Sequence, residues 1–95
     1  MRRPLFPSGK PPKASRRRAA TMLVVTYQLP RPFCGFVRDE EIRKAVQITP
    51  IGSGTDPRTM LRDVEFEFRN ADDARKAARR ARALGRVTTR THRMD

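Results

Sequence analysis

The sequence predicts a small α+β domain, in which four antiparallel strands form one sheet and the helices cover one of its faces. Apolar and acidic residues alternate through residues 61–68, a period of two that is typical of a strand with one buried and one solvated face. Alanine recurs every three or four residues through 71–84, which indicates a helix with an apolar stripe. The 95 residues leave room for one such domain.

Residues 22–29 (MLVVTYQL) predict the first strand, because β-branched and aromatic residues dominate them and Pro30 ends the run. One face of this strand carries four apolar side chains, Leu23, Val25, Tyr27 and Leu29. Prolines and a glycine then interrupt regular structure, and residues 39–44 form either a short helix or a loop. Residues 46–51 alternate and predict a second strand, followed by a long hairpin turn over residues 52–58 (GSGTDPR).

The third strand, residues 61–68, has Val64, Phe66 and Phe68 on one face and Asp63, Glu65 and Glu67 on the other. We expect the first set in the core and the second in water.

Residues 71–84 predict the one long helix of the chain. Asn70 is a good N-cap, and Asp72 and Asp73 lie in the first turn, where the helix dipole favours negative charge. Gly85 then provides a C-terminal stop. The alanines, with Leu84 at the end, share one side of this helix, and small side chains let a helix lie close to a sheet.

A last strand is expected over residues 86–92 (RVTTRTH), which hold β-branched residues and no helix breaker. The resulting order is strand, short helix, strand, strand, helix, strand. This order is that of a split βαβ, or ferredoxin-like, sandwich. A domain of this size buries only about 60% of its unfolded surface, so dimerisation would add stability.

Residues 1–21 differ in composition from the rest of the chain. They hold seven Lys and Arg residues, four prolines and no acidic residue, and therefore predict a flexible basic tail ahead of a single domain over residues 22–95. Two alternatives stay open, a dispensable leader ahead of Met22 and an organelle-targeting segment. No stretch is apolar enough for a membrane span, and we expect a cytoplasmic protein.

The composition argues against most catalytic chemistry. One cysteine cannot form an internal disulfide and one histidine cannot hold a metal alone, so we expect no enzyme, metal, cofactor or small-molecule substrate. Residues 52–54 (GSG) lack the lysine and following helix of a phosphate-binding loop. Glu65 and Glu67 are expected to balance nearby positive charge rather than to act as a catalytic pair. Cys34 is expected to be buried and His92 to be exposed.

Residues 64–77 (VEFEFRNADDARKA) resemble the third strand and second helix of RNA-recognition motifs, and residues 24–30 (VVTYQLP) are similar to that family's first strand. The resemblance implies the fold. In that family, aromatic side chains on the open sheet face stack on bases. The matching positions in this chain carry no aromatic side chain: they are Val25, Leu61 and Asp63, with Glu65 and Glu67 continuing the same face. The stacking platform is therefore not expected here.

The long helix is also similar to the last helix of double-stranded-RNA-binding domains, in which alanines alternate with lysines. Those domains place basic residues at the N-terminus of the helix, where they meet phosphates. This chain has Asp72 and Asp73 at that position.

The net charge of +12 favours a polyanionic partner. The helix and the residues after it present a basic ridge, made of Arg75, Lys76, Arg79, Arg80, Arg82 and Arg86. With Arg16, Arg17 and Arg18 of the tail, it predicts a non-enzymatic nucleic-acid-binding protein that contacts phosphates with little sequence preference. Alternatives are an ordinary solvated helix face, a protein-interaction or homodimerisation module, and a ribosome-associated structural protein.

Overall fold

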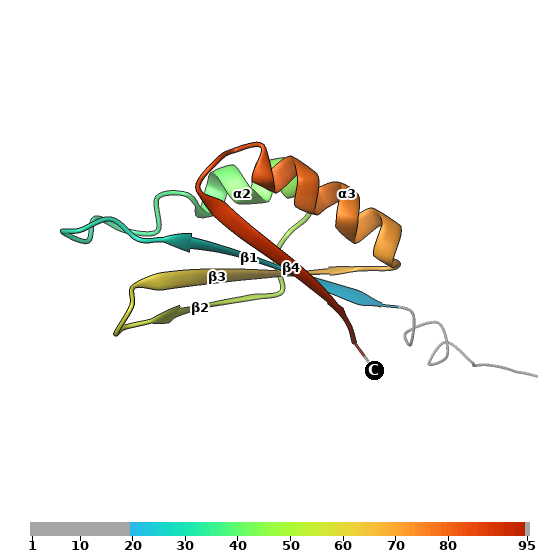
Figure 1. The fold of residues 1–95 in the computed structure, drawn as a ribbon, viewed down its shortest axis with the longest axis horizontal. Coiled ribbons are helices and arrows are strands. Elements are labelled where there is room, and N and C mark those ends of the chain that lie inside the picture. The colour runs from blue at the N-terminus through green and yellow to red at the C-terminus, as the bar shows by residue number, and fades with distance from the viewer. Residues whose placement is uncertain (1–19, 95) are drawn as a thin grey trace, which may run out of the picture.

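The computed structural model describes residues 20–94, which form a four-stranded antiparallel sheet and two helices (Figure 1). The elements follow one another as β1 (Thr21–Gln28), α2 (Asp39–Val46), β2 (Gly52–Asp56), β3 (Leu61–Phe68), α3 (Ala71–Arg82) and β4 (Val87–Arg93). The predicted α+β class is confirmed. Of the predicted tail, only Ala20 and Thr21 belong to the described part, and both are buried at the start of β1.

The strands lie in the order β2-β3-β1-β4, and each neighbouring pair is antiparallel. Both helices cover the same face of this sheet, and the opposite face is open (Figure 1). Because β1 and β3 occupy the centre, their alternating residues divide between the core and the open face. Neither helix of residues 20–94 is long and apolar enough to cross a bilayer.

The core forms where the apolar face of the central strands meets α3. All four residues predicted for this face of β1 are at most 2% exposed, as are Val64 and Phe66 of β3. Four alanines of α3 complete the contact from above: Ala74, Ala77, Ala78 and Ala81. Since alanine adds no side chain beyond Cβ, the axis of α3 lies close to the sheet.

The N-terminus of α3 is capped as the sequence predicts. Asn70 Oδ1 accepts a hydrogen bond from the backbone N–H of Asp73 at 2.9 Å. The helix ends at Arg82, two residues before the predicted end, and Leu84 and Gly85 continue in a turn. Gly85 has a φ of +81°, a left-handed conformation that glycine adopts at little cost.

The predicted strand over residues 46–51 is wrong. Val46 is instead the last residue of α2, where it is buried with Ile42 one turn earlier. Gln47 takes a left-handed conformation with a φ of 76° and donates its backbone N–H to Arg43 O at 2.8 Å, which ends the helix. The period-two pattern was therefore the end of a helix followed by a loop in which Ile48 packs on the core.

The second strand occupies residues that predicted a turn. β2 has the sequence GSGTD and pairs with the first part of β3, with Gly52 opposite Glu65 and Asp56 opposite Leu61. Backbone pairing with β3, rather than intrinsic strand propensity, holds this edge strand in place. A Cβ at position 52 would lie 3.1 Å from Glu65 Oε1, so glycine suits the close approach. The turn itself covers only residues 57–60.

The expectation for Cys34 is also wrong, because its side chain is exposed in the loop between β1 and α2. The loop holds no regular structure that would bring this residue under the helices. His92, on β4, is exposed as expected.

We expect Ala77→Leu to destabilise the protein by about 1 to 3 kcal/mol, because Ala77 is fully buried between α3 and the sheet and extra methylenes overpack this contact. Ala71→Leu makes the same chemical change at an exposed position of the same helix and should have much less effect. Urea unfolding of the two variants measures the difference. Equal losses of stability in both would contradict the close packing described here.

Candidate functional site

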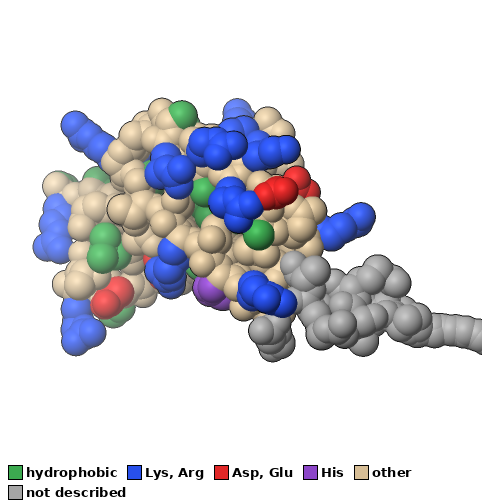
Figure 2. Space-filling view, turned by 45° about the vertical axis from the view of Figure 1, so that its right-hand side comes forward, with side chains coloured by type: hydrophobic (Ala, Val, Ile, Leu, Met, Phe, Trp, Pro, Cys, Tyr) green, Lys and Arg blue, Asp and Glu red, His purple; other side chains and the backbone are tan. Residues whose placement is uncertain are grey.

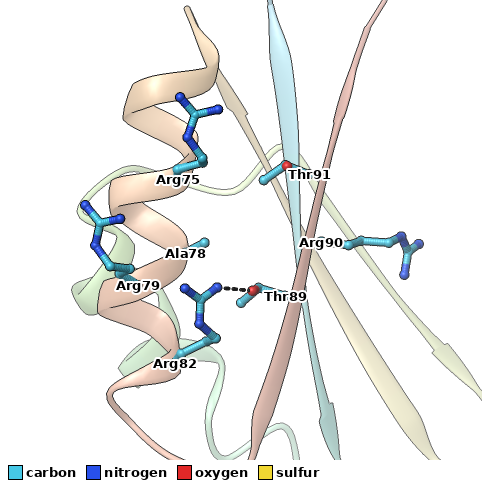
Figure 3. Close-up of a pocket in the computed structure, with 7 residues that line it drawn as sticks. All are labelled: Arg75, Ala78, Arg79, Arg82, Thr89, Arg90 and Thr91. Atoms are coloured by element: carbon cyan, nitrogen blue, oxygen red, sulfur yellow. Dashed lines mark hydrogen bonds between the residues drawn. The ribbon is translucent and has the colours of Figure 1, made fainter.

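A groove of about 200 Å³ runs between α3 and β4 on the helix side of the sheet. Ala78 lies at its floor, and one wall is formed by three arginines of α3, Arg75, Arg79 and Arg82. Thr89 and Thr91 of β4 form the other wall (Figure 3). The guanidinium of Arg82 is directed at Thr89, whereas those of Arg75 and Arg79 extend along the helix and away from β4 (Figure 3). Each guanidinium and hydroxyl group can donate a hydrogen bond to an anion.

The periods of the two elements create this groove. At 100° per residue, Arg75, Arg79 and Arg82 fall within about 60° of one another around α3. On β4, Thr89 and Thr91 lie opposite Val25 and Leu23 of β1, whose side chains belong to the core face. Their own side chains therefore point to the helix side.

Arg90 also borders the groove but points away from it. In the register it lies opposite Val24, and its side chain extends from the far side of β4 (Figure 3). This is the side of the open sheet face, as the alternation of a strand requires.

The three arginines differ in how they are held. Arg75 pairs with Asp72 one turn earlier on α3, and Arg82 Nη1 donates to Thr89 Oγ1 at 2.7 Å. Within residues 20–94, Arg79 takes part in none of the side-chain hydrogen bonds or ion pairs. Asp72 is the one acidic residue paired with this wall in the described part of the chain, so the groove keeps a net positive charge.

Arg80 does not join the groove. Its guanidinium donates to the backbone carbonyls of Ala45 at 2.7 Å and of Val46 at 2.9 Å, at the C-terminal end of α2. These carbonyls lack partners within their own helix. Arg80 therefore ties the two helices together, and its donors are directed away from solvent.

The remaining residues of the predicted ridge lie outside the lining. Lys76 and Arg86 are exposed, Lys76 on α3 and Arg86 in the turn before β4. Basic side chains dominate the face of the molecule shown in Figure 2, where few acidic ones accompany them. Three further predicted residues, Arg16, Arg17 and Arg18, lie outside the described part.

The open face of the sheet carries a row of acidic residues, in contrast to the basic groove. Its β3 row holds Asp63, Glu65 and Glu67, of which Asp63 accepts a hydrogen bond from Thr26 Oγ1 at 2.6 Å. Val25, one of the positions matched to RNA-recognition motifs, lies in the core instead of on this face. Val24 lies on the open-face side of β1 between Glu65 and Arg90, and is only 1% exposed. An aromatic platform is thus lacking among the described residues of this face.

A second polar cluster joins Tyr27, Asp39 and Arg62 beneath the start of α2. Tyr27 Oη donates to Asp39 Oδ1 at 2.7 Å, and Arg62 Nη2 donates to Asp39 Oδ2 at 2.7 Å. Arg62 also donates to the hydroxyls of Thr55 at 3.2 Å and Ser53 at 3.1 Å on β2. The cluster connects β1, β2 and β3 to α2, and so holds the short helix on the sheet.

Burial, followed by the hydrogen bond to Asp39, raises the pKa of Tyr27 to about 12. Both causes disfavour the phenolate. The hydrogen bond to Asp39 likewise raises the pKa of Arg62 above its usual value. The cluster therefore has a structural role at neutral pH, with the phenol neutral and the guanidinium charged.

Sequence reasoning missed the two threonines of the groove, although the alternation in RVTTRTH was available as a signal for the face they occupy. It also missed the partnership of Asp39 with Arg62, which are 23 residues apart. No local pattern marks such a pair. The engagement of Arg80 by α2 depends on helix packing in the same way.

Comparison with protein-family models, with curated proteins and with solved structures gave no match.

We expect Arg80→Ala to cost about 1 to 3 kcal/mol of stability, because it leaves the carbonyls of Ala45 and Val46 without their donors. Arg79→Ala removes the same side chain one position earlier and should change stability by no more than about 0.5 kcal/mol. Denaturant unfolding compares the two. If Arg79→Ala lowers the free energy of unfolding more than Arg80→Ala, the structural role given to Arg80 is wrong.

The ionisation of Tyr27 gives a direct pH test, because it is the single tyrosine and the chain has no tryptophan. The folded pKa lies above the ordinary 10.0, so its contribution to stability is complete below pH 10 and is lost as the pH rises towards 12. Ultraviolet absorbance of tyrosinate should show a midpoint near 12 in the folded chain.

Asp39→Asn removes the carboxylate and should move this midpoint down towards 10, whereas Glu41→Gln, on the same helix, should leave it in place. A midpoint near 10 in the unmodified folded chain would contradict the buried cluster.

Proposed function

We propose that this chain is a small non-enzymatic nucleic-acid-binding protein that holds backbone phosphates in the groove between α3 and β4. The observation that carries the proposal is the stripe of Arg75, Arg79 and Arg82 on α3, beside a groove whose other wall holds Thr89 and Thr91. Arginine suits bidentate contact with phosphate, and hydroxyl groups add neutral donors beside it.

The length of the arginine line fits a row of phosphates. Arg75 and Arg82 are seven residues apart, which corresponds to about 10 Å along a helix axis. One nucleic-acid strand carries a charge about every 3.4 Å of its axis, so the line spans about three phosphates. Such contacts position a backbone without reading bases, and weak sequence preference follows.

The exposed Lys76 and Arg86 extend the positive field around the groove. The arginines at positions 16–18 belong to the same proposal as a basic arm that follows the backbone beyond the groove. The acidic row on the open sheet face repels phosphate, so the nucleic acid lies on the helix side of the sheet.

We further assign the domain to the ferredoxin-like, split βαβ arrangement. The element order β-α-β-β-α-β, the strand order β2-β3-β1-β4 and the antiparallel pairing of every neighbouring pair support this assignment. It supplies the scaffold for the groove, because α3 crosses over the sheet between β3 and the edge strand β4.

The acidic row favours one second candidate, a module that associates with its own copy. The row of Asp63, Glu65 and Glu67 on one molecule would face the arginine groove of another. Sedimentation distinguishes this candidate, because a chain that stays monomeric at high concentration has no such contact. The ribosome-associated role and the cytoplasmic location remain predictions.

A salt titration with short duplex DNA and RNA tests the groove. Arg79→Ala combined with Arg82→Ala should lower affinity and reduce the slope of log K against log salt by about 2, since each phosphate contact contributes about 0.9. Arg43→Ala combined with Lys44→Ala removes equal charge from α2 and should change the slope less.

Removal of residues 1–19 should reduce the slope as well, while Ala20 and Thr21 are kept because they are buried against the sheet. Undetectable binding to both nucleic acids at low salt, or binding that high salt leaves unchanged, would rule out the proposed function.

A further inference from the structure

The loop between β1 and α2 exposes two aromatic rings. Phe33 is 52% and Phe36 46% exposed, and the neighbouring Val37 is 55% exposed. The two ring centroids are 5.4 Å apart and the rings meet edge to face at 61°. Large apolar side chains contribute nothing to the core in these positions, so their exposure needs another explanation. We call residues 30–38 the aromatic loop; it projects beyond the end of the sheet (Figure 1).

Two arginines fix the aromatic loop to the rest of the domain. The guanidinium of Arg62 lies over the ring of Phe36, 3.8 Å from its centroid, and is itself held by Asp39. At the end of the loop, Arg38 Nη1 donates to Gly85 O at 2.7 Å and Nη2 to Leu84 O at 3.3 Å. The rings are therefore presented by an anchored segment, which lowers the entropic cost of using them in binding.

The contact with Leu84 and Gly85 also sets the position of the aromatic loop relative to the groove. These two residues follow Ala83, the C-cap of α3, and Arg82 just before the cap forms the last part of the arginine wall. Arg86 comes next in the chain and is exposed. Arg38, the last residue of the aromatic loop, thus lies beside the turn that follows the groove-lining Arg82.

The charge around the aromatic loop selects a class of ligand. Three arginines, Arg31, Arg38 and Arg62, belong to the loop or contact it. Arg38 pairs with Glu41 and Arg62 with Asp39, so the uncompensated positive charge of this set is that of Arg31. A ligand that has both flat π surfaces and negative charge satisfies the rings, Arg31 and the arginines of the groove together. Single-stranded nucleic acid has this combination, since its unpaired bases are free to stack on aromatic side chains.

We infer that the aromatic loop stacks unpaired bases of a single-stranded segment whose phosphates lie in the groove between α3 and β4. The inference rests on the proposed function and adds the form of nucleic acid to it. Bases within a duplex are already stacked and paired, so they offer no free face to Phe33. Single strands should therefore use both the groove and the loop, whereas duplexes use the groove alone.

Phe33→Ala in the full chain tests the stacking. Phe33 is chosen because Phe36 also contacts Arg62. Stacking is worth about 1 to 3 kcal/mol per base, so affinity for a single-stranded oligonucleotide should fall by about fivefold to more than a hundredfold. Affinity for a duplex of the same length should stay within about twofold, and the salt slope for both should be unchanged, because no phosphate contact is lost.

Two matched variants separate stacking from simple apolar contact. Val37→Ala removes an equally exposed apolar side chain from the same loop and should leave single-strand affinity unchanged. Phe33→Tyr keeps the ring and should retain affinity, whereas Phe33→Leu keeps apolar bulk and should lose it. The fluorescence of 2-aminopurine placed in the oligonucleotide reports stacking directly, as quenching that the unmodified chain produces and Phe33→Ala does not.

The inference is overturned if Phe33→Ala leaves single-strand affinity unchanged, weakens duplex binding equally, or dissociates a dimer in sedimentation, because a second copy would then cover the rings. In each of these cases the proposed phosphate binding in the groove remains supported if the Arg79 and Arg82 double variant still reduces the salt slope. If the unmodified chain binds neither single strands nor duplexes, the proposed function fails and the inference fails with it.

Discussion

The contact of four small alanines with the sheet is the constraint on which the rest of the domain depends. Ala74, Ala77, Ala78 and Ala81 are at most 4% exposed, and their lack of bulk lets α3 lie low over β1 and beside β4. A helix at this height has the stripe of residues beside its alanines near the edge strand. Arg82 of α3 therefore reaches Thr89 of β4, and the groove between the two elements follows from how the core is packed.

The local signals in the sequence were sufficient for those elements whose period is long and regular. The alternation of β3 and the alanine spacing of α3 predicted both elements and both buried faces. The same reasoning failed for β2, because Val46 and Ile48 supplied an alternating pattern while the true strand, GSGTD, has low strand propensity. Only pairing with β3 makes those residues a strand, and such pairing has no local signature.

The candidate site was predictable to a similar extent. Helical periodicity alone groups Arg75, Arg79 and Arg82 on one stripe of α3. Arg80 instead binds the carbonyls at the end of α2. The position of that end depends on the left-handed conformation of Gln47. The facing threonines and the anchored aromatic rings both require the relative placement of distant segments. Tertiary contacts thus decide which arginines of a basic helix are free.

The position of β4 at the edge of the sheet has a further consequence. One side of this strand has no partner within residues 20–94, and unpaired edges invite other chains to add strands. Arg90 and Arg93 lie along this edge, and Arg82 approaches it from the helix. Two such edges brought together would concentrate like charges, so the cations that surround the groove also protect the protein from uncontrolled strand-to-strand aggregation.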